Sequence, residues 1–290
     1  MAEQSKQAPE DGIGTTSHEW DGIEELDTPL PRWWLWTFYA TIVFAIGYCV
    51  AYPAIPLATR ATAGVLRWSS HGQLAADQAK AEAGRAAFRQ AIANVPIERV
   101  PADSDQMRAA VEGGRAAFKV NCVQCHGSGA NGRKGYPNLT DDDWLWGGDI
   151  KTIRQTLEHG VRQPDDKQTR MSQMPAFGRD GILTADQVQD VVSYVRYISH
   201  QEGGTPSARR GRDLFAANCT ACHGVEGKGN RTFGAPNLTD AIWLYGGDRD
   251  TITETVTNAR YGVMPAWGGK LDKASLNMLA AYVHSLGGGE

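Results

Sequence analysis

The chain has 290 residues, of which 41% are hydrophobic and 21% are charged, and its formal net charge is −4. This length allows two or three small domains with packed cores, and the slightly acidic balance argues against a protein that binds nucleic acid. Much of the negative charge lies at the start, because residues 1–32 hold eight acidic side chains against only Lys6 and Arg32. We therefore predict an acidic N-terminal segment over residues 1–32.

An uncharged stretch follows this segment, and residues 33–51 read WWLWTFYATIVFAIGYCVA. About 20 apolar residues suffice to cross a bilayer as a helix. Aromatic residues at the two ends, from Trp33 to Tyr52, match the side chains that sit at membrane interfaces, and Pro53 stops the helix. The sequence predicts one transmembrane helix within residues 33–56. A cleaved signal peptide is the alternative, but it would need a short basic leader rather than a long acidic one.

Residues 57–107 are rich in Ala, Gln, Arg and Glu, with apolar residues at mixed helical spacings. This pattern predicts one or two helices that link the membrane to the rest of the chain. The string GRAAF occurs in this linker at residues 84–88 and again at 114–118. The first copy is interpreted as part of a helix and not as a lost functional site.

The rest of the chain carries one five-residue pattern twice, as CVQCH at residues 122–126 and as CTACH at residues 219–223. C-x-x-C-H is the signature of c-type haem attachment, in which two sulfurs bond the porphyrin and the histidine binds the iron. A zinc site would need further Cys or His ligands, and the remaining cysteine, Cys49, lies in the apolar stretch. We predict two covalently bound haem c groups. Their attachment residues are Cys122, Cys125 and His126 for the first haem, and Cys219, Cys222 and His223 for the second.

A longer repeat surrounds these two patterns. PNLTD, then WLWGGD or WLYGGD, then MPAFG or MPAWG follow each pattern in the same order. The first copy has about nine additional residues near 163–172, which we interpret as a loop insertion. We predict two tandem domains, at residues 108–200 and 207–287, joined by a hinge at residues 202–207 that is rich in turn-forming residues.

Both domains are predicted to be helical, so that the fold class is all-α. One helix precedes each CxxCH pattern, and a second covers residues 150–159 in the first repeat and 251–258 in the second. A third helix ends each repeat, and Thr184 is a good N-cap for the first of these. Domains of this size have little core of their own, so a flat apolar haem would complete it.

The sixth position of each iron needs a ligand from outside the CxxCH patterns. Met174 and Met264 are the candidates, because each opens its MPA string at the same place in its repeat. A thioether opposite a histidine raises the reduction potential of a haem, whereas the alternative is that each Met only fills core space. His159 aligns with Asn258, so a pair of histidines would not serve both repeats. Whether each Met binds the iron of its own repeat or of the other repeat stays open at this point.

Two further sets of residues are expected around each haem. Pro137 and Pro236 follow the CxxCH patterns, and their carbonyls are expected to accept a hydrogen bond from the ligand imidazole and so fix its orientation. The aromatic side chains of the WLxGGD strings are expected to wall the pockets or, alternatively, to pack in an ordinary core. These side chains are Trp144, Trp146, Trp243 and Tyr245.

Each repeat resembles a class I cytochrome c, and the chain from residue 21 onwards resembles subunit III of cbb3-type cytochrome c oxidase, the FixP/CcoP family. The most specific part is DGIEELDTPLPRWW at residues 21–34, joined to one membrane helix and two CxxCH units. The resemblance implies that the chain accepts electrons from a soluble cytochrome c or from a bc complex. It would pass them to the monohaem subunit and to the haem–copper catalytic subunit of a proton-pumping, oxygen-reducing complex.

Covalent haem attachment takes place outside the cytoplasm. Residues 1–32 are therefore predicted to be cytoplasmic and the haem domains periplasmic, with the helix in the lipid of a bacterial inner membrane. Because both axial positions of each iron would be filled, we expect an electron relay that is not itself an enzyme. Two alternatives remain, a free-standing membrane-tethered diheme shuttle and a diheme peroxidase with one open iron position.

Overall fold

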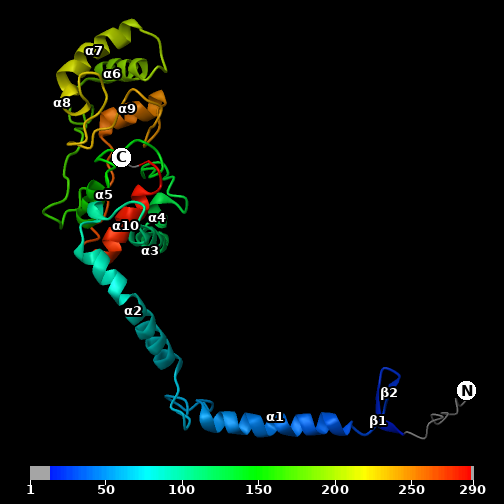
Figure 1. Cartoon of the computed structure of the whole chain (residues 1–290). Helices are drawn as coiled ribbons and strands as arrows, with labels where there is room; N and C mark the ends of the chain where they lie inside the picture. The colour runs from blue at the N-terminus through cyan, green and yellow to red at the C-terminus, as the bar shows by residue number, and fades with distance from the viewer. Residues whose placement is uncertain (1–13, 289–290) are drawn as a thin grey trace, which may run out of the picture. The chain divides into compact units, whose positions relative to one another are not determined.

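The computed structural model describes residues 14–288 of the chain (Figure 1). Its internal contacts divide the chain at Gly84 into two compact units, which are described separately below. Helices are the main secondary structure of both units, as the sequence predicts, and the described residues also include one small hairpin.

The hairpin lies in the acidic segment before the membrane helix. Strand β1 (Thr15–Trp20) pairs in antiparallel fashion with β2 (Ile23–Leu26). The two turn residues, Asp21 and Gly22, both have positive φ angles, of 51° and 87°. Asp-Gly is favoured in such two-residue turns, because their backbone twist matches the twist of the strands. The all-α prediction did not include this hairpin, although the Asp-Gly pair indicates it.

Helix α1 (Arg32–Ala51) is the predicted membrane helix, and it spans 20 residues. None of its residues is buried, and Trp33 and Trp36 are 70% and 73% exposed. Among the described residues, α1 is the one helix long and apolar enough to cross a membrane. The exposed apolar side chains suit a helix whose surroundings are lipid.

The predicted linker contains a long helix, α2 (Ser70–Asn94), followed by one 3-10 turn, η1 (Ile97–Arg99). The expectation of one or two helices in this region is confirmed. The end of α2 and η1 contribute Ile92 and Ile97, both almost completely buried, to the core of the second unit.

The second unit contains four helices from each repeat, in the same order (Figure 1). From the first repeat these are α3 (Asp105–Asn121), α4 (Val123–His126), α5 (Ile150–His159) and α6 (Ala185–Ile198). From the second they are α7 (Pro206–Asn218), α8 (Thr220–His223), α9 (Arg249–Asn258) and α10 (Lys273–His284). The predicted N-cap of α6 is confirmed, because Thr184 and Gln187 form a reciprocal capping box that satisfies two free backbone amides.

The last helices of the two repeats are exchanged. Helix α6 packs against α7 and α9, which belong to the second repeat, whereas α10 packs against α3 and α5 of the first (Figure 1). The two cores follow this exchange, since Phe118 shares a cluster with Leu276 and Leu279, and Phe215 shares the other with Val191 and Val192. The predicted boundaries 108–200 and 207–287 describe the sequence repeats, but each packing group combines helices from both.

The short connection between α6 and α7 explains the exchange. Only residues 199–205 separate the end of α6 from the start of α7, and helices joined by so short a loop usually lie antiparallel and in contact. The segment predicted as a hinge between independent domains therefore joins two helices of one packing group.

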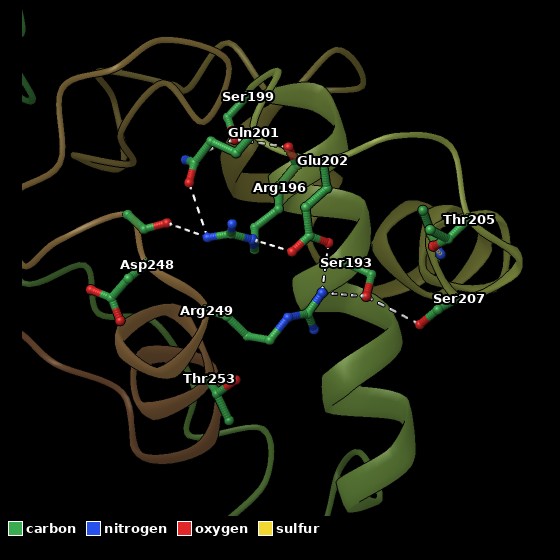
Figure 2. Close-up of polar contacts among 12 residues, drawn as sticks. Ser193, Arg196, Ser199, Gln201, Glu202, Thr205, Ser207, Asp248, Arg249 and Thr253 are labelled. Carbon is green, nitrogen blue, oxygen red and sulfur yellow. Dashed lines mark hydrogen bonds and ion pairs between the residues drawn. The ribbon is translucent and has the colours of Figure 1, made fainter.

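Arginine side chains fasten this connection to α9 (Figure 2). Glu202 accepts a hydrogen bond from Arg196 Nε at 2.5 Å and another from Arg249 Nη2 at 2.6 Å. Arg196 also donates to the carbonyl of Gly247 at 2.9 Å. Burial opposes ionisation, but these hydrogen bonds hold the pKa of Glu202 below its ordinary value. Because the groups are mostly shielded from water, the network stabilises more than an exposed ion pair would.

Glycines allow the closest approach of the exchanged helices. A Cβ atom added at Gly114 of α3 would lie 2.0 Å from the carbonyl oxygen of Met278 in α10. At Gly211 of α7 it would lie 1.9 Å from the carbonyl oxygen of Asp190 in α6. Each repeat thus uses a helical glycine at the crossing, although glycine disfavours helix formation.

We expect Gly114→Ala to lower the free energy of unfolding by about 2–3 kcal/mol, because the backbone of α10 would have to move away. The matched control is Gly84→Ala in the other GRAAF string, where a Cβ atom meets nothing within 4 Å. That change should be neutral or stabilise the helix by up to about 1 kcal/mol. Denaturant unfolding followed by tryptophan fluorescence measures both effects. Equal effects of the two substitutions would contradict the close crossing.

Candidate functional site

The first CxxCH pattern lies at a helix end. Helix α3 ends at Asn121, Cys122 is its C-cap, and the single turn α4 places Cys125 and His126. Cys122 is buried, and its pKa is raised to about 11, first by burial and then by the neighbouring Cys125 thiol. The cysteines are free of disulfide bonds, so both sulfurs are available to form thioethers.

The second pattern repeats this geometry. Cys219 has φ and ψ of −115° and −27°, and Cys122 has −114° and −27°. Burial, followed by the Cys222 thiol, raises the pKa of Cys219 to about 11. Within residues 14–288, no group of three or more His, Cys, Asp or Glu side chains gathers as a metal site. The zinc alternative therefore lacks the additional ligands that it requires.

Backbone carbonyls orient the two histidines. Nδ1 of His126 lies 3.0 Å from the carbonyl oxygen of Pro137, and Nδ1 of His223 lies 3.1 Å from that of Pro236. A carbonyl can only accept, so Nδ1 carries the proton and the lone pair of Nε2 is free to bind iron. Burial lowers the pKa of both imidazoles, and the bond to the carbonyl partly opposes this shift. These contacts confirm the predicted role of the two proline carbonyls.

A large apolar cavity lies beside His223. Its empty volume is about 1410 Å³, open mouth included, and its walls include Cys219, Cys222 and Phe215. Two free thiols, an oriented imidazole and an apolar cavity fit a covalently attached haem.

The methionine in this cavity comes from the other repeat. Met174 lines the cavity together with His223 and packs against the core cluster that contains Phe215 and Cys219. Met264 packs against the opposite cluster, which contains Cys122. The exchange of helices therefore brings Met174 to the cavity beside His223, and Met264 to the core cluster that contains Cys122. The sequence left this choice open.

Aromatic residues of the WLxGGD strings lie at the site of their own repeat, and two residues of these strings contact the other repeat. Trp243 and Tyr245 line the cavity beside His223, as expected for pocket walls, and Trp144 packs against the other core cluster. The indole of Trp146 lies so close to Gly234 that an added Cβ atom would be 2.3 Å from it. At the equivalent place of the other repeat, the ring of Tyr245 lies 3.3 Å from a Cβ atom added at Gly135.

The competing histidine of the first repeat has another role. His159 is paired through Nδ1 with the carboxylate of Asp166, at 3.1 Å, inside the additional loop of this repeat. Sequence analysis missed Arg162, which lies in the same loop and lines the cavity beside His223. The feature of the sequence that could have indicated Arg162 is the insertion, because it carries a cation that has no counterpart in the second repeat.

The fold and the site define a membrane-anchored protein of the cytochrome c class, whose helical domains hold haem through cysteine sulfurs. Comparison with known sequences narrows the class, and the chain belongs to the subunit III family of cbb3-type cytochrome c oxidases, named CcoP or FixP. Members of this family are electron-transfer subunits of the cytochrome c type. The resemblance drawn from the sequence is confirmed.

Family descriptions match three consecutive parts of the chain. Residues 12–59 match the N-terminal domain of cytochrome oxidase-cbb3, FixP; residues 111–199 match cytochrome c; and residues 206–283 match cytochrome c oxidase, cbb3-type, subunit III. The chain is 55% identical to the cbb3-type cytochrome c oxidase subunit CcoP of Cereibacter sphaeroides over 95% of each chain. It is 51% identical to the subunit FixP of Azorhizobium caulinodans over 99% of this chain and 98% of that one.

Proposed function

We propose that the protein is a membrane-anchored diheme electron relay of a cbb3-type terminal oxidase. It takes electrons from a soluble cytochrome c or a bc complex and delivers them to the monohaem and haem–copper subunits, which reduce oxygen and pump protons. The duplicated attachment geometry, in which a proline carbonyl orients each histidine and each methionine packs against the core cluster of the other repeat's cysteine, is the observation that carries this proposal.

Each residue of the site has a role in this proposal. Cys122 and Cys125 hold the first haem and Cys219 and Cys222 the second, while His126 and His223 present Nε2 to the irons. Met264 completes the first site and Met174 the second. Each haem, when bound, supplies an iron that takes up and releases one electron. The apolar walls exclude water and keep the thioethers in place, so neither site offers a position for a substrate.

The proposed topology follows from where haem attachment takes place. Helix α1 spans the bacterial inner membrane once, residues 1–32 are cytoplasmic, and the haem domains are periplasmic. The membrane helix then holds the relay next to the membrane-embedded subunits. This arrangement keeps transfer within one complex, which a freely diffusing shuttle would not do.

Purification of the tagged full-length chain in mild detergent tests this function. We expect the haem–copper and monohaem subunits to co-purify, and the preparation to consume oxygen when reduced cytochrome c is supplied. A matched chain in which a cleavable export signal replaces residues 1–56 should keep its haems but lose these partners. If the full-length chain emerged alone, the free-standing shuttle would be favoured; peroxide turnover by that chain would favour the peroxidase.

A further inference from the structure

The insertion in the first repeat carries a residue that breaks the symmetry between the two haem sites. Gly160 aligns with Ala259 and Arg170 with Arg260, so residues 161–169 have no counterpart in the second repeat. Within this segment, Val161 pairs with the backbone of Met264, through hydrogen bonds of 3.0 Å in both directions. The insertion therefore reaches the methionine loop of the other repeat.

The guanidinium of Arg162 lies between the two methionine loops. Its Nε donates to the carbonyl of Gly262 at 2.7 Å, and its Nη1 donates to the carbonyl of Ser172 at 2.8 Å. These carbonyls occupy equivalent places, because each lies two residues before a candidate ligand, Met264 or Met174. The guanidinium is planar and rigid, so its two hydrogen bonds fix the position of the charge more firmly than the hydrogen bonds of a flexible lysine ammonium group would.

This charge faces the cavity beside His223. Arg162 is half-buried and lines the cavity together with Met174. In the part of the chain that the structure describes, no carboxylate forms an ion pair with it. Burial lowers the pKa of this guanidinium, and the phenol groups of Tyr245 and Tyr261 only partly oppose that shift. A buried charge is costly unless a group of opposite charge pairs with it.

A haem brings such a group, because its propionate side chains are carboxylates. We propose that Arg162 binds a propionate of the haem held by Cys219 and Cys222, and that it thereby makes this haem the stronger electron acceptor of the two. The inference rests on the proposed function, which places a haem at His223. Arginine is suited to the task, since its fork pairs with a carboxylate through two parallel hydrogen bonds.

This cation is one charged group that distinguishes the two sites. Each repeat already contributes an arginine over an aromatic ring, with Arg170 at 5.3 Å from the Trp146 centroid and Arg260 at 4.6 Å from that of Tyr245. Those two are equivalent, whereas Arg162 is additional. A fixed positive charge stabilises the iron with one more electron, so an electron shared between the haems resides preferentially at the His223 site.

Redox titration of the haem-loaded full-length chain, followed by visible absorption, tests the proposal. In Arg162→Gln, the ratio of reduced to oxidised haem at the His223 site should fall at least tenfold at a fixed ambient potential, about 59 mV for a one-electron couple. The same ratio at the His126 site should change less than threefold. Lys167→Gln removes the same charge from an exposed position of the same insertion and should leave both couples unchanged. Met174→His identifies the His223 couple, because replacing the thioether lowers its potential.

Four outcomes would overturn the inference or its basis. An unchanged His223 couple in Arg162→Gln, or an equal shift of both couples, would overturn the role of Arg162 while the haems remain. If Arg162→Gln does not accumulate, Arg162→Lys is the variant to test. Lysine lacks the paired donors of the guanidinium, so the ratio of reduced to oxidised haem at the His223 site should still fall about threefold. No change in that ratio would overturn the proposal. A wild-type chain that carries only one covalently bound haem would instead overturn the haem at one site, and the proposed function with it.

Discussion

Met174→Ala is expected to open the iron held by His223, whereas Met264→Ala is expected to open the iron held by His126. The reason is the exchange of helices, which places Met174 in the cavity of the second repeat and Met264 beside the core of the first. Each single variant should then bind one carbon monoxide per chain in the reduced state, and the wild type none. The exposed Met171, three residues before Met174, is the matched control, and Met171→Ala should bind none.

Chains that carry a single haem identify which iron each methionine serves. With Cys219 and Cys222 both changed to Ser, only the haem at His126 remains. In that background we expect Met264→Ala to bind carbon monoxide and Met174→Ala not to bind it. The reverse result would show that each methionine serves the iron of its own repeat, and the exchanged ligation would be wrong.

Separating the two repeats is expected to abolish both haem sites. When residues 85–203 and 204–290 are produced as separate chains, both behind a cleavable export signal, each loses the last helix and the methionine that complete its attachment site. Helix α10 alone contributes Leu276, Leu279 and Val283, all almost fully buried, to the core around Phe118. Burial of each such side chain contributes about 1.5–3 kcal/mol, so their sum is comparable with the whole stability of a small domain.

Production of both pieces in one cell should restore the sites, because the exchanged helices can still find their partners. The matched control is a full-length chain that is cut between Gly203 and Gly204 after folding, whose halves should co-elute with both haems on size exclusion. Haem absorption and carbon monoxide binding measure the outcome. A first repeat that alone holds a methionine-ligated haem would contradict the exchange.

Much of the site could be predicted from the sequence, because its chemistry is local. The CxxCH patterns place two sulfurs and an imidazole within five residues, and the carbonyls of Pro137 and Pro236 lie a short loop away. Helix ends were equally predictable where a capping residue marks them, as Thr184 does for α6. The buried face of α6 includes Val188, Val191 and Val192, and their spacing of three and four residues is the one that places side chains on a single helix face.

The pairing of the repeats could not be predicted, because the two copies are so alike that packing within and between them would use the same kinds of contact. The connection over residues 199–205 determines whether helices pack within a repeat or between repeats. Its short length is more important for this choice than its glycines. Gly203 and Gly204 led to the expectation of a hinge, whereas Glu202 is fixed by Arg196 and Arg249. The orientation of Arg162 was equally hidden, since sequence places it only in a loop.

The number of haems on each chain is the most direct test of the whole interpretation. Intact-mass analysis of the purified full-length protein should show a polypeptide heavier than its sequence by two haem groups that resist extraction with acid and organic solvent. Replacing both cysteines of either CxxCH pattern should remove one of them. A chain that carries a single haem, or none, would contradict the diheme relay.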